Sequence, residues 1–198
     1  MIKRYVKLVV AGAILPLSFA PLEIYPVAYF SLAILFHYWL DAKPKDAFFH
    51  GLIFGIAFFT SGISWIYISV HHFGGLPAIL SILITALMIL LFSFLIAAQG
   101  WIQSWLALRQ PDWKKCLLIY PAAWVVFEWL RCHLFFNGFP WLLLGYSQTS
   151  TVMANNAHII GVFGISLLVA LINGCMCLLA RINSRTTKSI ATTIIVLI

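Results

Sequence analysis

The sequence has 198 residues, of which 63% are hydrophobic and 9% are charged, and its formal net charge is +7. An ordinary soluble domain carries about 25% charged residues, so this chain has too few charges to cover the surface of a water-soluble globule. Its solvent must be the lipid bilayer. The positive charge does not indicate nucleic-acid binding, because the basic residues lie in small groups between long apolar segments, as orientation signals do in membrane proteins.

Long uncharged intervals define the predicted helices, since about 20 apolar residues cross the hydrocarbon core. The interval 47–108 is long enough to cross twice, and the sequence 71–77 breaks it with Gly74, Gly75 and Pro77. We therefore predict an all-α polytopic membrane helix bundle that forms a single transmembrane domain over residues 1–198, with six spans and the start of a seventh. The predicted spans are 6–22, 24–40, 47–70, 77–107, 115–134 and 157–180, with a partial span at 190–198.

The basic residues predict the orientation of this bundle. Every Lys and Arg except Arg131 lies at one set of alternating span ends. The positive-inside rule therefore predicts a cytoplasmic N-terminus. It also predicts that the turns near Glu23, 71–77 and 137–156 lie on the outer side. The partial span at 190–198 would then point outward, so any continuation of the chain would be extracytoplasmic.

The first residues have one alternative interpretation. Lys3, Arg4 and Lys7 precede an apolar run that ends in the sequence 18–20, Ser-Phe-Ala, which is typical of a secretory signal peptide. Pro21 would then follow the cleavage site, where its fixed ring geometry fits poorly. We favour a first membrane span, and the predicted topology of the other spans does not depend on this choice.

Hydroxyl and imidazole side chains near the turns do not predict a catalytic or metal site. Ser69 and His72 can share a helix face, but no carboxylate lies nearby to orient the imidazole of a serine triad. His71, His133 and His158 are also predicted on the outer side, without the spacing of metal ligands. We expect interfacial histidines, no bound metal and no cofactor.

Gly51 and Gly55 are four residues apart in the third predicted span. Small residues at this spacing allow the backbones of two membrane helices to approach closely. The pair therefore predicts tight helix packing rather than a binding site.

Glu128 and Arg131 are ionisable residues within a predicted span and lie three positions apart on one helix face. Such residues usually mark a functional site in a membrane protein. Two interpretations are open: Arg131 binds a phospholipid phosphate bidentately, or the two residues form a structural ion pair at a helix end. Trp124 lies one turn earlier and can cover the pair.

The segment 137–156 is poor in helix-forming residues. Gly138, Pro140 and Gly145 interrupt the helix, and Trp141 and Tyr146 lie among them. Each aromatic ring alone is typical of the interfacial belt of a membrane protein. Non-helical backbone at membrane depth, however, persists only where it is buried in protein or lines a cavity. The segment therefore predicts a site on the outer side.

Three sequence blocks carry a resemblance to a known family. The first block is Ser-Gly-Ile-Ser-Trp-Ile-Tyr-Ile-Ser at 61–69, followed by Phe-Gly-Gly-Leu-Pro at 73–77. The second block has Pro-Ala-Ala-Trp at 121–124 and Glu-Trp-Leu-Arg at 128–131. The third block has Gly-Phe-Pro-Trp at 138–141 and Gly-Tyr-Ser-Gln at 145–148. In order and spacing they resemble apolipoprotein N-acyltransferase. The resemblance covers nearly the whole chain from about Ala11, and the third block is the most specific.

This resemblance implies a multi-pass protein of the bacterial inner membrane. The family's activity is transfer of a phospholipid acyl chain to the α-amino group of the diacylglyceryl-modified N-terminal cysteine of an apolipoprotein. In the family a nitrilase-like domain holds the Glu base, the Lys that stabilises the oxyanion and the Cys nucleophile. None of these three can be assigned in this sequence. We therefore expect no catalytic residue in the chain and no activity from the chain alone.

The resemblance implies that phospholipid and apolipoprotein are the partners, and a separately encoded catalytic domain is a further candidate. The alternative from another class is a small helical membrane transporter or a lipid-binding scaffold, in which Glu128 and Arg131 would lie on the transport pathway. The candidate lipid and substrate platform comprises Trp65, Tyr67, Glu128, Arg131, Gly138, Pro140, Trp141, Gly145, Tyr146 and Gln148.

Overall fold

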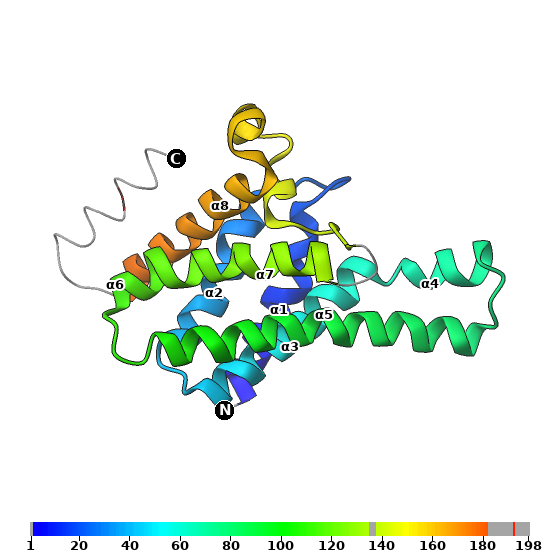
Figure 1. The fold of residues 1–198 in the computed structure, drawn as a ribbon, viewed down its shortest axis with the longest axis horizontal. Coiled ribbons are helices and arrows are strands. Elements are labelled where there is room, and N and C mark those ends of the chain that lie inside the picture. The colour runs from blue at the N-terminus through cyan, green and yellow to red at the C-terminus, as the bar shows by residue number, and fades with distance from the viewer. Residues whose placement is uncertain (1, 135–137, 182–191, 193–198) are drawn as a thin grey trace.

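The computed structural model describes residues 2–134, 138–181 and 192 (Figure 1). Within these residues every regular element is a helix and none is a strand, which confirms the all-α class. The predicted partial span at 190–198 lies outside the described residues except for position 192.

The first half of the chain forms two helices and a longer interrupted one. Pro26 and Pro44 occupy the first helical position of the second and third helices. A backbone N–H at that position has no partner within the helix, so proline, which lacks the N–H, costs no hydrogen bond there. The elements are α1 (Ile2–Ile14) with the 3₁₀ turn η1 (Leu15–Ser18), α2 (Pro26–Leu40), α3 (Pro44–Ile63), α4 (Ile66–Ile68) and the π turn η2 (Ser69–Phe73).

The second half begins after the predicted Gly-Gly-Leu-Pro break. The next helix starts at Ala78, directly after Pro77, and the last helix is kinked at Gly161, whose φ is 65°. The elements are α5 (Ala78–Leu106), α6 (Asp112–Lys114), the π turn η3 (Lys115–Ile119), α7 (Tyr120–Leu134), the 3₁₀ turns η4 (Leu144–Gln148) and η5 (Val152–Asn156), and α8 (Ala157–Arg181).

Three of the described helical segments are long and apolar enough to cross a membrane: Pro44–Ile63, Ala78–Leu106 and Val152–Arg181. The helix α2 is apolar but has 15 residues, which rise only about 22 Å, less than the hydrocarbon thickness of about 30 Å. The helices α1 and α7 are also shorter than a full span. The count of six spans and the orientation therefore stay predictions.

Small residues bring α3 and α5 together along their length. A Cβ atom on Gly51 would lie 2.6 Å from the carbonyl oxygen of Ile96, and one on Gly55 would lie 2.8 Å from the Cα of Ser93. These distances leave no room for a side chain, so the predicted close packing at Gly51 and Gly55 is confirmed.

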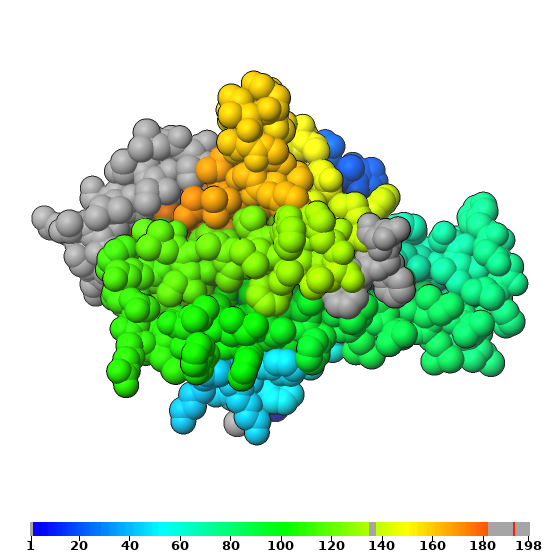
Figure 2. Space-filling view, viewed as in Figure 1, coloured from blue at the N-terminus to red at the C-terminus, as the bar shows by residue number. Residues whose placement is uncertain are grey.

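Aromatic side chains fill the centre of the bundle. The rings of Phe36 on α2 and Tyr120 on α7 lie 5.3 Å apart, and those of Phe59 on α3 and Phe92 on α5 lie 5.4 Å apart. Large apolar side chains also lie outside, and Leu87 on α5 is 65% exposed. Figures 1 and 2 show α5 lying beside α7 on one face, with the α4–α5 hairpin extending beyond the other helices. This apolar exterior supports contact with lipid.

Polar side chains cross-link the first, second and last helices. The side chain of Asn173 on α8 accepts a hydrogen bond from the N–H of Ala33 at 2.7 Å and donates one to the carbonyl of Ala28 at 3.0 Å. The hydroxyl of Ser31 donates to the carbonyl of Ala11 at 2.7 Å. Such bonds hold helices together where the solvent supplies no alternative partner.

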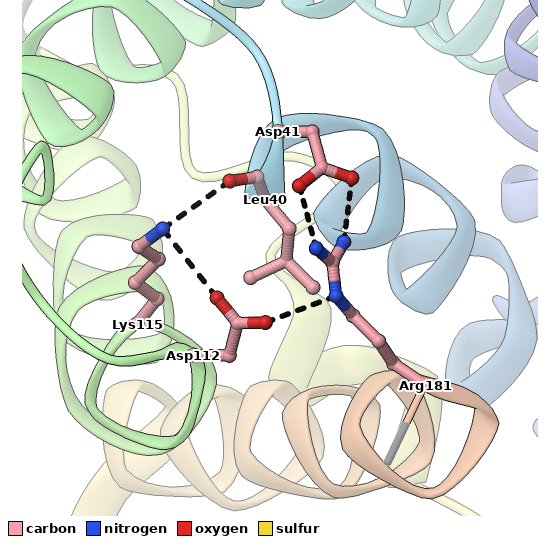
Figure 3. Close-up of polar contacts among 5 residues, drawn as sticks. All are labelled: Leu40, Asp41, Asp112, Lys115 and Arg181. Atoms are coloured by element: carbon pink, nitrogen blue, oxygen red, sulfur yellow. Dashed lines mark hydrogen bonds and ion pairs between the residues drawn. The ribbon is translucent and has the colours of Figure 1, made fainter.

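An ionic cluster joins three helix ends at one end of the bundle (Figure 3). Arg181 donates to both carboxylate oxygens of Asp41 at 2.6 Å, and its Nε lies 2.9 Å from Asp112. Lys115 lies 3.5 Å from Asp112 and donates to the carbonyl of Leu40 at 3.3 Å. The cluster therefore ties the ends of α2 and α8 to the start of α6.

Candidate functional site

The segment 138–148 leads from α7 toward α8 and has an irregular backbone. Gly138 has a φ of 95°, and Leu142 has a φ of 55°. A Cβ atom on Gly138 would lie 1.9 Å from the carbonyl oxygen of Cys132. Both the positive φ and this close approach require glycine at position 138. The predicted break in the helix is therefore a turn built on Gly138, and we call residues 138–148 the site segment.

Glu128 binds the site segment through its backbone. The carboxylate is buried, and its Oε1 accepts hydrogen bonds from the indole N–H of Trp124 at 2.9 Å and from the backbone N–H of Leu144 at 2.7 Å. The first bond confirms that Trp124 covers Glu128. The second fixes the start of η4 against α7.

Arg131 holds the same segment from the other side. Its Nη1 donates to the carbonyl of Trp141 and its Nη2 donates to the carbonyl of Leu142 at 3.1 Å. The guanidinium carbon lies 5.4 Å from the ring centroid of Phe59, within cation–π range. Arg131 is 4% exposed, so both terminal nitrogens are used by peptide carbonyls inside the protein.

Glu128 and Arg131 make no direct ion-pair contact within 4.0 Å, the contact that one of the two open interpretations requires. Among the described residues the ion pairs within 4.0 Å join only Asp41, Asp112, Lys115 and Arg181. Glu128 and Arg131 instead bind separate backbone groups, an N–H and two carbonyls. Neither interpretation included these partners, because no residue type in the sequence marks a backbone group as a partner.

Gly145 and Gln148 attach the site segment to two other helices. The N–H of Gly145 donates to the hydroxyl of Ser166 on α8 at 2.8 Å, and a Cβ on Gly145 would lie 2.3 Å from the carbonyl of Val162. The side-chain oxygen of Gln148 accepts a hydrogen bond from the hydroxyl of Tyr29 on α2 at 2.7 Å. The segment is therefore fixed to α2, α7 and α8.

One wall of a cavity of about 700 Å³ is formed by the site segment. The rings of Trp65 and Trp141 lie 5.4 Å apart beside it, and both are about half exposed. The volume lies within the range of about 300–1,000 Å³ that is usual for ligand pockets. We call this cavity the tryptophan cleft; it is lined by Ala13, Pro16, Leu17, Phe19, Ala20, Pro21, Leu22, Ser61, Gly62, Trp65, Pro140, Trp141, Leu142, Tyr146 and Thr149.

The chemistry of the tryptophan cleft is that of an apolar binding site. Its few polar side chains are largely used within the protein, since Ser61 donates to the carbonyl of Ala57 at 2.9 Å and Thr149 donates to the carbonyl of Tyr146 at 3.2 Å. None of the lining residues that the structure describes is ionisable at neutral pH. The cleft can therefore bind a hydrocarbon chain, and its described lining holds no acid, base or activated nucleophile.

The structure divides the predicted platform into two groups. Trp65, Pro140, Trp141 and Tyr146 line the cleft, whereas Glu128, Arg131, Gly145 and Gln148 lie behind its wall. Gly138 begins the site segment and is not among the lining residues. Tyr67 belongs to neither group, because its ring stacks on that of His71 at 5.4 Å in the α4–η2 turn.

Sequence reasoning missed the opposite wall of the cleft and two anchoring hydroxyls. Pro16 and Pro21, near the turn between α1 and α2, line that wall. Tyr29 and Ser166 anchor the site segment. The prolines were visible as breaks in the first apolar run, and a polar residue such as Ser166 within an apolar helix is a usable signal for a buried hydrogen bond.

Comparison with known proteins decides the family. The sequence model described as "Apolipoprotein N-acyltransferase N-terminal domain" matches residues 11–175. The chain belongs to the apolipoprotein N-acyltransferase family. The resemblance carried by the three sequence blocks is therefore confirmed, and the described site segment lies within the matched residues.

Individual members of the family match most of this chain. The apolipoprotein N-acyltransferase of Coxiella burnetii is 43% identical over 188 residues, which are 95% of this chain and 39% of that protein. Those of Methylococcus capsulatus and Shewanella oneidensis are 40% and 39% identical and are covered to 32% and 34% of their lengths. The chain thus spans between 32% and 39% of the length of these apolipoprotein N-acyltransferases.

Proposed function

We propose that this chain is the membrane half of an apolipoprotein N-acyltransferase-like protein and that the tryptophan cleft receives an acyl chain of the phospholipid donor. Family membership and the apolar helices support a role within the membrane. The distribution of basic residues supports six spans in a bacterial inner membrane with the N-terminus in the cytoplasm. In this orientation the cleft opens toward the outer leaflet.

The observation that carries the proposal is the composition of the tryptophan cleft. Its walls are apolar, its volume is about 700 Å³, and Trp65, Trp141 and Tyr146 lie at its exposed edge. Indole and phenol rings prefer the level of the lipid head groups. A phospholipid can therefore place its head group beside these rings and one acyl chain between the α1–α2 turn and the site segment.

Glu128 and Arg131 act in this proposal as positioning residues. They bind the backbone on both sides of Leu143 and thereby hold the wall that carries Trp141. A binding wall made of irregular backbone needs such support, because its geometry is otherwise free to relax. Direct binding of a phosphate by Arg131 remains a prediction. It is not favoured, because the guanidinium is buried and donates hydrogen bonds to two peptide carbonyls.

The acyl transfer itself is assigned to a nitrilase-like domain, as the family resemblance implies. The acyl group would leave its phospholipid ester, pass through a thioester with the Cys of that domain and form an amide with the α-amino group of the apolipoprotein. We propose that the chain alone is inactive and that it works with such a domain, encoded with it or separately. An assay of the purified chain with phospholipid and diacylglyceryl lipopeptide tests this, and acyl transfer would contradict it.

The lipid-binding role is tested with a phospholipid that carries a photoactivatable diazirine on its acyl chain. After illumination of the reconstituted chain, we expect cross-linked peptides from the cleft lining. Ala20→Trp places a bulky ring in the cleft and should reduce this labelling. The control Ile79→Trp lies on the exposed surface of α5 and should not. Labelling that is uniform along the apolar helices, and unchanged in Ala20→Trp, would contradict the proposal.

A further inference from the structure

A second cavity lies at the other ends of the helices that form the tryptophan cleft. It has a volume of about 180 Å³ and lies where the α2–α3 turn meets the end of α5. Lys43, Ser104, Lys115 and Tyr120 are among its lining residues, and the exposed Asp41 and Lys43 place its mouth at the surface. We call it the basic-end cavity.

Ser104 marks the basic-end cavity as a polar site. The residue is 4% exposed, and within the described part of the chain its Oγ has no hydrogen-bond partner. Buried hydroxyl groups are nearly always hydrogen-bonded in proteins. A serine in the last turns of an apolar helix, lining a cavity and lacking a protein partner, therefore indicates a polar ligand in that cavity.

The charge around the cavity favours an anion. Lys43 caps the N-terminus of the 20-residue helix α3, where no side chain accepts a hydrogen bond from the first N–H groups. A helix N-terminus carries a partial positive charge that favours an anion. Lys115 also lines the cavity, but its ammonium group is paired with Asp112 and donates to the carbonyl of Leu40. In the described residues Lys43 forms no ion pair within 4.0 Å.

Basic side chains largely neutralise the negative charge of the carboxylates near the cavity. Both oxygens of Asp41 accept hydrogen bonds from Arg181, and Asp112 is shared between Arg181 and Lys115 (Figure 3). Asp46 lies in the first turn of α3 but does not line the cavity. The groups that remain for a ligand are the Lys43 ammonium and the Ser104 hydroxyl.

We propose that the basic-end cavity binds a phosphate group, supplied either by the head group of an anionic phospholipid or by free phosphate. Lys43 contributes charge, Ser104 donates a hydrogen bond, and the N-terminus of α3 contributes its partial positive charge. The bound group would connect the α2–α3 turn to the end of α5. This site is separate from the tryptophan cleft, so the proposal does not depend on acyl-chain binding there.

The test compares three variants of the purified full chain. Lys43→Gln and Ser104→Ala each remove one predicted ligand, whereas Lys45→Gln removes a basic residue two positions from Lys43 that does not line the cavity. Inorganic phosphate is titrated at constant ionic strength, and its affinity is read from the rise in thermal stability. We expect the first two variants to bind about tenfold more weakly or worse, as loss of a hydrogen bond to a charged group implies. Lys45→Gln should bind as the unmodified chain does.

A second experiment distinguishes a lipid head group from free phosphate as the source of the bound phosphate group. The chain is extracted from nanodiscs of phosphatidylcholine with phosphatidic acid, and retained lipid is counted by native mass spectrometry. Retention of phosphatidic acid that Lys43→Gln abolishes identifies a lipid head group, and binding of inorganic phosphate alone identifies the free anion. Failure of both to bind would overturn the proposal. An equal loss of phosphate affinity in Lys45→Gln would also overturn the proposal, because it would show that the anion is attracted by the general positive charge of the surface.

Discussion

The carboxylate of Glu128 accepts a hydrogen bond from the backbone N–H of Leu144 at 2.7 Å, across 16 positions of sequence. Together with the two bonds from Arg131 to the carbonyls of Trp141 and Leu142, it holds a non-helical segment inside a helical bundle. The backbone groups of that segment thus gain the partners that lipid cannot supply. The site segment depends on two ionisable residues that do not touch the proposed ligand.

Replacement of Glu128 tests this dependence on its acceptor. Glu128→Leu leaves the N–H groups of Trp124 and Leu144 without a partner, and we expect it to lower the free energy of unfolding by about 3 kcal/mol. Glu128→Gln keeps a side-chain oxygen as acceptor, so its free energy of unfolding should fall by less. Unfolding in a denaturing-detergent titration measures both, and equal stability of the two variants would show that the carboxylate oxygen does not support the segment.

Arg131 should not tolerate exchange for another cation. An ammonium group cannot reproduce the planar fork that reaches Trp141 and Leu142 together, so Arg131→Lys should loosen the site segment. We expect faster proteolysis within residues 138–148 and reduced cross-linking at the tryptophan cleft. If Arg131 acts instead as a bidentate lipid phosphate ligand, Arg131→Lys would weaken lipid binding while the site segment stays resistant to proteolysis.

Gly145 should not accept even one methyl group. Gly145→Ala would place its Cβ 2.3 Å from the carbonyl of Val162, so η4 must move away from α8. Overpacking of this kind costs about 1–3 kcal/mol, which a thermal unfolding midpoint would reveal. Ser150→Ala, at an exposed position a few residues later, is the matched control and should leave the midpoint unchanged.

The ionic cluster predicts a specific dependence on pH. The hydrogen bonds from Arg181 hold the pKa of the Asp41 carboxyl below its ordinary value. A lowered pKa in the folded state stabilises the fold above the unfolded pKa of about 3.9, and this contribution is lost as pH falls below that value. Asp41→Asn should therefore be less stable than the unmodified chain at pH 6, and the difference should shrink below pH of about 4. A difference that grows on acidification would contradict the assignment.

The ends of the helices were predictable because breaker residues mark them. The last long turn before α5 was expected at 71–77, and α5 begins at Ala78. The same reasoning missed that η2 continues the helical backbone through His71 and His72, because a π turn has no clear sequence signature.

The contacts of the site were not predictable from residue spacing. Tyr29 and Gln148 are 119 positions apart, and Arg181 meets Asp41 across 140 positions. Pairings at this range are set by how the helices pack, which the apolar pattern leaves open. Backbone partners are harder still, since every residue other than proline offers the same N–H and carbonyl that Glu128 and Arg131 use.

Cysteine accessibility across intact inner membranes tests the central claim most directly, namely that the tryptophan cleft and the basic-end cavity lie on opposite sides of the bilayer. Single cysteines replace the exposed His72, Ser150 and Arg109 in a background where the half-buried Cys132 is serine. A membrane-impermeant maleimide added to the periplasmic side should label positions 72 and 150, and position 109 should react only after the membrane is opened. Labelling of position 109 with protection of 72 and 150 would contradict this orientation.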